Sequence, residues 1–228
     1  MRRKAIEEMF RRFAEAEPEP KGELTHADPY TLLVAVVLSA QATDAGVNRA
    51  TPALFAAAPT PSAMVALGED DVRYLIRTIG LYNTKAKNLI ALSHALLDRH
   101  EGRVPADREA LQALPGVGRK TAAVVMQMAF GAETIAVDTH VFRVSNRTGL
   151  APGKTPDAVE AALEKAVPKP YRRHAHHWLI LHGRYICLAR KPQCWRCRIA
   201  DLCAYTAKTP EPPGSERVQP ASPSLPPA

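Results

Sequence analysis

Apolar residues recur along most of the chain at spacings of three and four, which is the pattern of helices that bury one face. Residues 4–17 form the first such segment, and its apolar face consists of Ile6, Met9, Phe10 and Phe13. The run from Tyr30 to Ala40 is instead apolar nearly all round. Because Asp28 and Pro29 supply an N-cap and a proline at the first helical position, this run is predicted as a helix rather than a buried strand. Such a helix belongs in the centre of a bundle.

The same pattern predicts helices for most of the remaining chain. Turn residues separate them, and the alternation that marks half-buried strands is largely absent. These helices cover residues 44–57, 61–67, 70–78, 84–100, 107–114, 119–130 and 139–148, a segment that begins at 155, and residues 171–188. Aromatic residues, which favour strands, make up only 6% of the chain. The predicted fold class is therefore all-α.

Residues 114–122, which read LPGVGRKTA, form a glycine-containing turn between two of these helices. Asp107 is a candidate N-cap for the short first helix, and Pro115 ends that helix. Gly116 and Gly118 permit backbone conformations that other residues adopt only at a cost. A turn of this kind leaves the first amide groups of the second helix free, and such amides suit a phosphate oxygen.

Lys120 lies in the first turn of that second helix. The positive end of the helix dipole and the neighbouring Arg119 both favour its neutral amine, which is a nucleophile. The alternative is a solvated surface lysine, and the local pattern supports both equally. Asp138 follows downstream and precedes the helix expected from residue 139. It could cap that helix, stabilise a developing positive charge on a sugar, or take a proton from Lys120.

The four cysteines of the chain lie within one short segment and follow the spacing C-x6-C-x2-C-x5-C. They are Cys187, Cys194, Cys197 and Cys203. Four thiolates suit a zinc ion or an iron–sulfur cluster, but zinc ordinarily uses two C-x2-C pairs, so a single pair favours iron. Lys191 is one of several basic residues between the cysteines. Such a loop could clamp a phosphate, and its charge could also offset the thiolates.

Four histidines precede the cysteines on the helix expected at 171–188. They are His174, His176, His177 and His182. His174 and His177 have the i, i+3 spacing that a metal would use. Because no acidic partner accompanies them, we interpret the four as solvated or hydrogen-bonded helix residues rather than metal ligands.

The net charge of +7 and the pI near 9.4 favour a polyanionic partner. No segment reaches about eighteen consecutive apolar residues, and no apolar core follows the basic N-terminus, so we expect neither a membrane span nor a signal peptide. A reducing, cytoplasmic location follows, in which clustered cysteines bind metal rather than form disulfides. From residue 209 the composition changes to mainly proline, serine, glycine and alanine, which predicts a disordered tail at 209–228.

The LPGVGRKTA turn, the downstream aspartate in the run VDTHV and the cysteine spacing occur in one order between about residues 23 and 205. Together they resemble the helix-hairpin-helix superfamily of DNA glycosylases, and most closely its endonuclease III family, whose members carry one 4Fe–4S cluster. The resemblance implies two helical domains with a DNA-binding cleft between them. One is a six-helix bundle at 23–133 that contains the helix-hairpin-helix at 107–130. The other is an iron–sulfur cluster domain at 134–208, formed by both chain termini, with the N-terminal helix of 1–22 packed on it.

The resemblance also implies a reaction on double-stranded DNA that contains damaged pyrimidines or abasic sites, performed by a monomer. Lys120, assisted by Asp138, would release an oxidised pyrimidine such as thymine glycol and cut the strand by β-elimination through a Schiff base. Gln41 resembles the residue that fills the gap left by the base, and Leu81 resembles a wedge against the opposite strand. The alternatives are a helix-terminal polar residue for Gln41 and ordinary packing for Leu81. The remaining expected DNA contacts are Gly116, Val117, Gly118, Arg119, His140 and Lys191.

Two rival functions follow from the same motifs. An adenine mismatch glycosylase shares the hairpin, the aspartate and the cluster, but it usually lacks the lysine and carries a further C-terminal domain. Here Lys120 is present and the chain closes on a proline-rich segment, which favours the pyrimidine glycosylase. A non-catalytic iron–sulfur DNA-binding protein is the second rival. The hairpin alone fits it, whereas the hairpin together with Lys120, Asp138 and the cysteines favours an enzyme.

Overall fold

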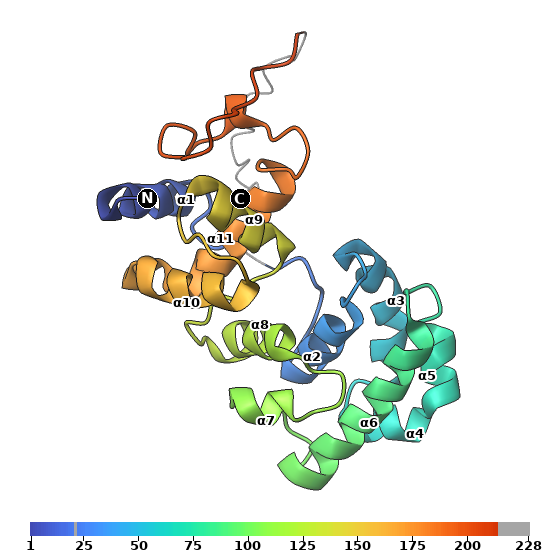
Figure 1. The fold of residues 1–228 in the computed structure, drawn as a ribbon. Helices are drawn as coiled ribbons and strands as arrows, with labels where there is room; N and C mark the ends of the chain where they lie inside the picture. Colours follow the sequence, from blue (N-terminus) through green and yellow to red (C-terminus); the bar gives the residue numbers. More distant parts are fainter. Residues whose placement is uncertain (21, 214–228) are drawn as a thin grey trace, which may run out of the picture.

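The computed structural model describes residues 1–20 and 22–213, and within those ranges it contains helices and no strand (Figure 1). The all-α prediction is therefore confirmed. The α-helices are α1 (Arg3–Ala16), α2 (Pro29–Leu38), α3 (Asp44–Ala57), α4 (Pro61–Leu67), α5 (Glu69–Leu75), α6 (Tyr82–His100), α7 (Arg108–Gln112), α8 (Arg119–Phe130), α9 (Thr139–Thr148), α10 (Pro156–Ala166) and α11 (Arg172–Tyr185), with short 3-10 helices η1 (Lys169–Tyr171) and η2 (Cys194–Arg196). Across the same ranges no single helix is long and apolar enough to cross a membrane, although the bent pair α3 and α4 passes that test together. Most of the tail predicted at 209–228 lies outside the described residues.

Helix α2 forms the centre of the first of two hydrophobic cores. All of its residues from Tyr30 to Leu38 are buried, as the apolar run predicts, and Asp28 and Thr31 form a capping box at its start. Figure 1 shows α2 between α8 on one side and α3 and α6 on the other. Other buried side chains of this core include Leu54, Met64, Val72, Leu92, Leu111 and Val125. Burying each side chain of this size stabilises the folded state by roughly 1.5–3 kcal/mol. Because α2 is buried along nearly its whole length, the other helices of this core pack around it.

The second core brings the N-terminal helix together with the helices that precede the cysteines (Figure 1). The ring of Phe10 in α1 stacks on Tyr171, with 5.9 Å between the ring centroids, and lies 6.2 Å from the ring of Trp178 in α11. Other members of this core are Ile6, Met9, Phe13, Val141, Val144, Val159, Leu163 and Leu179. The two ends of the described chain are therefore packed into one unit.

Residues 135–137 connect the two cores. Ile135 and Val137 are buried in the second core, whereas Ala136 between them is buried in the first. In an extended segment, alternate side chains point in opposite directions, so a single stretch can pack against both cores. The division into units at 1–22, 23–133 and 134–208 remains a prediction, and the two cores support it. One consequence is that α8 and Asp138, which are close in sequence, belong to different cores.

Helix boundaries differ from the predicted ones by one to three residues at several ends; α5, for example, ends at Leu75 rather than near residue 78. Two of these differences follow from turns. Helix α6 begins at Tyr82, with Leu81 at its N-cap in a left-handed conformation, rather than after a cap at Thr84. Helix α11 ends at Tyr185 rather than near residue 188, because the chain turns back and the amide of Gln193 donates to the carbonyl of Ile186 at 2.8 Å. Tertiary contacts hold the turns that set both boundaries. The residues at a helix end do not predict such contacts, so the sequence alone places these boundaries only approximately.

Candidate active site

The turn between α7 and α8 requires only one of its two glycines on conformational grounds. Gly116 has a φ of +76°, and a Cβ built there would lie 3.0 Å from the side chain of Asn88 on α6. Gly118 has an extended backbone with a φ of −86°, and a Cβ there would meet open space. The prediction that both glycines supply unusual conformations is therefore wrong for Gly118. Val117 is buried and its amide donates to the carbonyl of Leu114 at 3.1 Å, so its side chain belongs to the core.

The first turn of α8 carries amide groups that no side chain caps. Gly118 offers no capping group there, whereas α2, α3, α4, α7, α9 and α10 each begin with an aspartate or threonine that caps the helix. Arg119 forms ion pairs with Asp157 at 2.8 Å and Glu160 at 3.4 Å, both on α10. Its charge is thus partly balanced within the protein, and it links the hairpin to the second core. The uncapped amides are the groups of this turn that suit an anion.

Lys120 is exposed and lies where two hollows meet. The first, here called the Asp138 hollow, is lined by Lys120, Asp138 and His140 among others. The second, called the His176 hollow, lies between α2, α8 and α11 and is lined by Lys120, His176 and His177 among others. The two hollows share a wall made of Ser39, Asp44 and Arg184. The fold thus brings the two predicted catalytic residues to one depression from helices that belong to different cores.

The position of Asp138 follows from its role at the start of α9. Its Oδ1 accepts a hydrogen bond from the amide of Val141 at 2.8 Å, so the predicted N-cap is confirmed. Helix α9 lies close against α11 because Gly183 leaves room for it: a Cβ at Gly183 would lie 2.8 Å from the Cβ of His140. The Nδ1 of His140 is 3.2 Å from Nη2 of Arg143. Capping therefore holds the carboxylate at the edge of the hollow in a fixed orientation.

The histidines of α11 contribute to this region in a way that the sequence did not indicate. Of the two expected environments, solvated or hydrogen-bonded, neither ring is solvated: His176 and His177 are buried, and His176 is hydrogen-bonded. Because a carbonyl can only accept, the 2.8 Å hydrogen bond between His176 and Ala136 places the ring hydrogen on Nδ1, which leaves Nε2 as an acceptor. Burial lowers the pKa of His176 and lowers that of His177 to about 4, so both rings are neutral at neutral pH. In the sequence, the only signal of this burial is the apolar residues that share a helix face with the two histidines.

Gln41 and Leu81 occupy neighbouring turns, and both have a left-handed backbone with φ values of 55° and 60°. A residue with a side chain reaches that region only at a cost of about 1–2 kcal/mol. A Cβ built on Gly80 would lie 3.9 Å from the carbonyl oxygen of Gln41, which places the two turns beside each other. The side chain of Leu81 is 58% exposed, so the alternative of ordinary packing is wrong for this residue.

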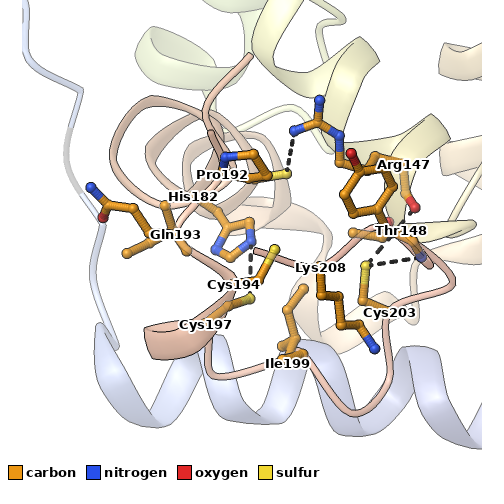
Figure 2. Close-up of a pocket in the computed structure, with 14 residues that line it drawn as sticks. Arg147, Thr148, His182, Pro192, Gln193, Cys194, Cys197, Ile199, Cys203 and Lys208 are labelled. Carbon is orange, nitrogen blue, oxygen red and sulfur yellow. Dashed lines mark hydrogen bonds between the residues drawn. The ribbon is translucent and has the colours of Figure 1, made fainter. Parts of the chain in front are cut away.

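The cysteine segment folds around a hollow beside the C-terminal end of α11 (Figure 2). Its lining includes four free thiols, those of Cys187, Cys194, Cys197 and Cys203. Arg147 of α9 reaches the hollow, with Nη1 3.5 Å from the sulfur of Cys187 and 2.6 Å from the carbonyl oxygen of Leu188, to which it donates. His182 of α11 lies on another side, with Nε2 3.7 Å from the sulfur of Cys197. Two helices of the second core thus hold the segment in place.

The arrangement of these thiols fits a cluster rather than a single metal ion. A zinc ion requires ligands that meet at one point, each sulfur lying about 2.3 Å from the metal. In the part of the chain that the structure describes, no three His, Cys, Asp or Glu side chains converge in that way. The four thiols instead surround a hollow whose other walls include Ile186 and Ile199. Thiolates spread around an apolar space of this kind suit an iron–sulfur cluster. Lys191, between the first two cysteines in the sequence, is exposed and has a φ of 49°.

Comparison with known protein families gives two matches that together cover most of the chain. Residues 34–169 match the family described as HhH-GPD superfamily base excision DNA repair protein. Residues 187–203 match the iron-sulfur binding domain of endonuclease III. The chain is 57% identical over 201 residues to Endonuclease III of Escherichia coli (strain K12), a match that covers 88% of this chain and 95% of that protein. Endonuclease III of Haemophilus influenzae is 55% identical over the same share of each chain.

Solved structures show the same fold. A trapped covalent intermediate of endonuclease III with DNA, an estranged-adenine complex, has a TM-score of 0.84 and 44% identity, and the match covers 90% of this chain and 96% of that one. A thermostable thymine-DNA glycosylase has a TM-score of 0.79 and 29% identity, covering 89% and 95%. The agreement in sequence and in fold over most of both chains shows that this chain belongs to the endonuclease III family of HhH-GPD base excision DNA repair proteins, with a 4Fe–4S cluster as its cofactor.

Proposed function

We propose that this DNA glycosylase and abasic-site (AP) lyase removes oxidised pyrimidines, such as thymine glycol, from duplex DNA and cuts the strand through a Schiff base on Lys120. The observation that carries the proposal is that Lys120 and Asp138 line one hollow. Lys120 also stands in the uncapped first turn of α8, where amide groups suit a phosphate. A nucleophile, a carboxylate and an anion-binding turn are the groups needed around a phosphodiester-linked sugar.

A similar solved structure supports the covalent step. It is described as a trapped covalent intermediate between endonuclease III and DNA. An intermediate of that kind requires a nucleophile on the protein. In this chain Lys120 is an exposed amine at the hollow that it shares with Asp138, which makes it our candidate for that nucleophile.

Binding would begin with the DNA backbone and then disturb the base stack. The uncapped amides at Gly118 and the start of α8 and the basic residues of the cysteine loop, including Lys191, would hold phosphates. Val117 is buried, so any contact that it makes uses backbone atoms. The damaged base would be extruded into the His176 hollow beside Lys120. His140, which lines the Asp138 hollow, and Arg119, which precedes Lys120 on α8, would also contact the DNA backbone.

Two further residues would stabilise the extruded state. Gln41 would enter the gap left by the base, and Leu81 would part the bases of the opposite strand. Leu81 is exposed and both residues hold a costly backbone conformation, which is a feature of functional positions. The neighbouring positions of the two turns would direct both side chains towards one site in the duplex.

The chemistry would proceed in two steps. In the first, Nζ of Lys120 forms a bond to C1′ of the sugar while the glycosidic bond breaks and the base leaves with its electron pair. Asp138 accepts the proton that the amine loses and stabilises the positive charge on the sugar. The C1′–O4′ bond then breaks as the lysine nitrogen forms a double bond to C1′ and O4′ takes up a proton, which opens the sugar ring and gives the Schiff base. In the second step, loss of a C2′ proton from the Schiff base breaks the C3′–O bond by β-elimination. The strand is then cut on the 3′ side of the lesion.

The remaining parts of the proposal concern the cofactor and the setting. The cluster, when bound, ties four points of the 187–203 segment together and holds that loop in one conformation. The relatives named above are bacterial proteins, and the substrate is DNA. We therefore place the enzyme in the bacterial cytoplasm, acting on DNA as a monomer.

Borohydride trapping tests the proposed function. Iron-loaded protein is incubated with a duplex that contains one thymine glycol and is then reduced. We expect a nicked strand and a covalent protein–DNA complex. Lys120→Ala should form no complex while it still binds the duplex. Lys165→Ala provides the matched control, because Lys165 is an exposed lysine on α10 that lines neither hollow.

Two results would contradict the proposal. The first is a wild-type, iron-loaded sample that leaves the thymine glycol duplex intact. The second is a covalent complex formed by Lys120→Ala at the wild-type rate, which would assign the nucleophile to another amine. A parallel duplex with adenine opposite an oxidised guanine separates the rival adenine glycosylase, since that substrate should remain uncut.

A further inference from the structure

Lys85 is a buried amine that lies outside both hollows. Its side chain on α6 is only 5% exposed, and Nζ donates a hydrogen bond to the carbonyl of Leu38 at 3.0 Å. Burial lowers the pKa of Lys85, and no acidic side chain among the described residues counteracts that effect. Burying an amine costs free energy that an apolar side chain of the same size would not. The position therefore calls for a specific role.

The carbonyl of Leu38 depends on this lysine. Leu38 is the last residue of α2, and its carbonyl would meet the amide of Ala42 if the helix continued. The amide of Ala42 donates instead to the carbonyl of Ser39 at 3.1 Å, because the chain turns there. Leu38 is itself fully buried, although the residues that follow it reach the surface. The lysine supplies the missing donor, and its positive charge suits the negative end of the helix.

The same residue is also attached to the second turn. The backbone amide of Lys85 donates to the carbonyl of Leu81 at 3.0 Å, which is the first hydrogen bond of α6. Lys85 therefore contacts one turn through its backbone and the other through its side chain. Gln41 lies three residues after Leu38. Through these two hydrogen bonds the lysine connects the turn that carries Gln41 to the turn that carries Leu81.

We propose that Lys85 is a positioning residue that sets the spacing between Gln41 and Leu81, so that both side chains enter the duplex at the same lesion. The inference rests on the roles given above to those two residues. Each turn has a left-handed residue at its tip, and such conformations persist only where the surroundings hold them. Catalysis responds to displacements of about 1 Å, so a loosened connection lowers the population in which the base is extruded.

The test compares duplex and single-stranded substrates, because a single strand presents its sugar without extrusion of a base from a duplex. Lys85→Met in the full, iron-loaded protein keeps an unbranched apolar stem and removes the amine. Lys87→Met, two residues further on and exposed on the same helix, is the matched control. Each variant is trapped with borohydride on one abasic oligonucleotide, presented alone and in a duplex. A 2-aminopurine placed opposite the abasic site reports disturbance of the stack by its fluorescence.

We expect Lys85→Met to trap the duplex about tenfold more slowly, while its rate on the single strand stays within about twofold of wild type. The 2-aminopurine signal should fall in this variant, and Lys87→Met should match wild type in all three measurements. Circular dichroism and the iron absorption check the fold. If Lys85→Met does not fold, Lys85→Gln keeps an N–H donor on a shorter stem and should show a smaller loss, confined to the duplex.

Two outcomes would overturn the inference. Equal losses on the duplex and on the single strand would show that Lys85 supports the fold in general. Unchanged rates on both would show that it has no part in the reaction. A wild-type protein that traps neither substrate would refute the proposed function, and the 2-aminopurine signal would then still decide on Lys85, since it requires no covalent step.

Discussion

His176 of α11 donates its Nδ1–H to the backbone carbonyl of Ala136 at 2.8 Å, two residues before Asp138. The bond connects a helix of the second core to a residue whose side chain is buried in the first. It therefore holds the short connection that delivers Asp138 to the start of α9. The geometry of the proposed catalytic pair depends on contacts between the cores as well as on the two helices that carry the side chains.

The first prediction concerns this hydrogen bond. His176→Leu should lower the free energy of unfolding by about 1–3 kcal/mol, because the Ala136 carbonyl is left buried without a donor. His176→Asn can place an amide N–H where Nδ1 stood, and it should lose less. Urea denaturation of the two variants makes the comparison. Equal losses would show that the shape of the ring, rather than its hydrogen bond, stabilises this connection.

The second prediction concerns pH. Burial lowers the pKa of His177 from 6.5 to about 4, so below pH 6.5 the unfolded chain binds a proton that the folded chain does not. Stability contributed by the neutral ring is therefore lost as the pH falls through this range. We expect the free energy of unfolding to fall by about 2 kcal/mol between pH 7 and pH 5 from this residue. His177→Gln should show a smaller fall over the same interval in urea denaturation, and an identical fall would refute the assignment.

The third prediction separates the two hairpin glycines. Gly116→Ala should destabilise the protein by about 1–2 kcal/mol, since the residue has a positive φ and its Cβ would crowd Asn88. Gly118→Ala should change stability by no more than about 0.5 kcal/mol, because its backbone is extended and the space is open. Thermal unfolding measures both. DNA affinity should fall in Gly116→Ala, and equal behaviour of the two variants would show that the φ of Gly116 is not required.

The fourth prediction concerns the cysteine loop. Cys197→Ser should abolish the broad iron absorption near about 400 nm. Loss of the cluster frees the loop, so Lys191 and its basic neighbours no longer stand in fixed positions. The affinity for duplex DNA should fall, and its dependence on salt concentration should become less steep. A wild-type salt dependence in this variant would show that the loop does not bind phosphates.

Local sequence signals predicted much of this structure. Asp28, Asp107 and Asp138 cap the helices that they were expected to cap, because a cap needs only the two or three residues that follow it. The apolar run of α2 is buried on all sides as its composition indicates. The cysteine spacing predicted a shared metal centre, and the four thiols line one hollow.

What local signals could not predict depends on contacts between distant segments. Leu81 is the N-cap of α6, in a turn that lies beside the turn of Gln41, although Thr84 is the better capping residue by composition. Arg119 is paired with acids of α10, which no pattern around the hairpin reveals. His176 and His177 are buried by the approach of the two cores, so their burial is a property of the whole fold.

The amino-acid sequence by itself determined the helices, most of their caps, the hairpin and the cysteine ligands, because these depend on interactions within a few residues of chain. Only the tertiary structure decided that Lys120 and Asp138 line one hollow, that Lys85 connects two turns, and that two histidines are held neutral. The physical reason is that the packing of the two cores sets these distances and burials, and packing sums many weak contacts between residues far apart in the chain.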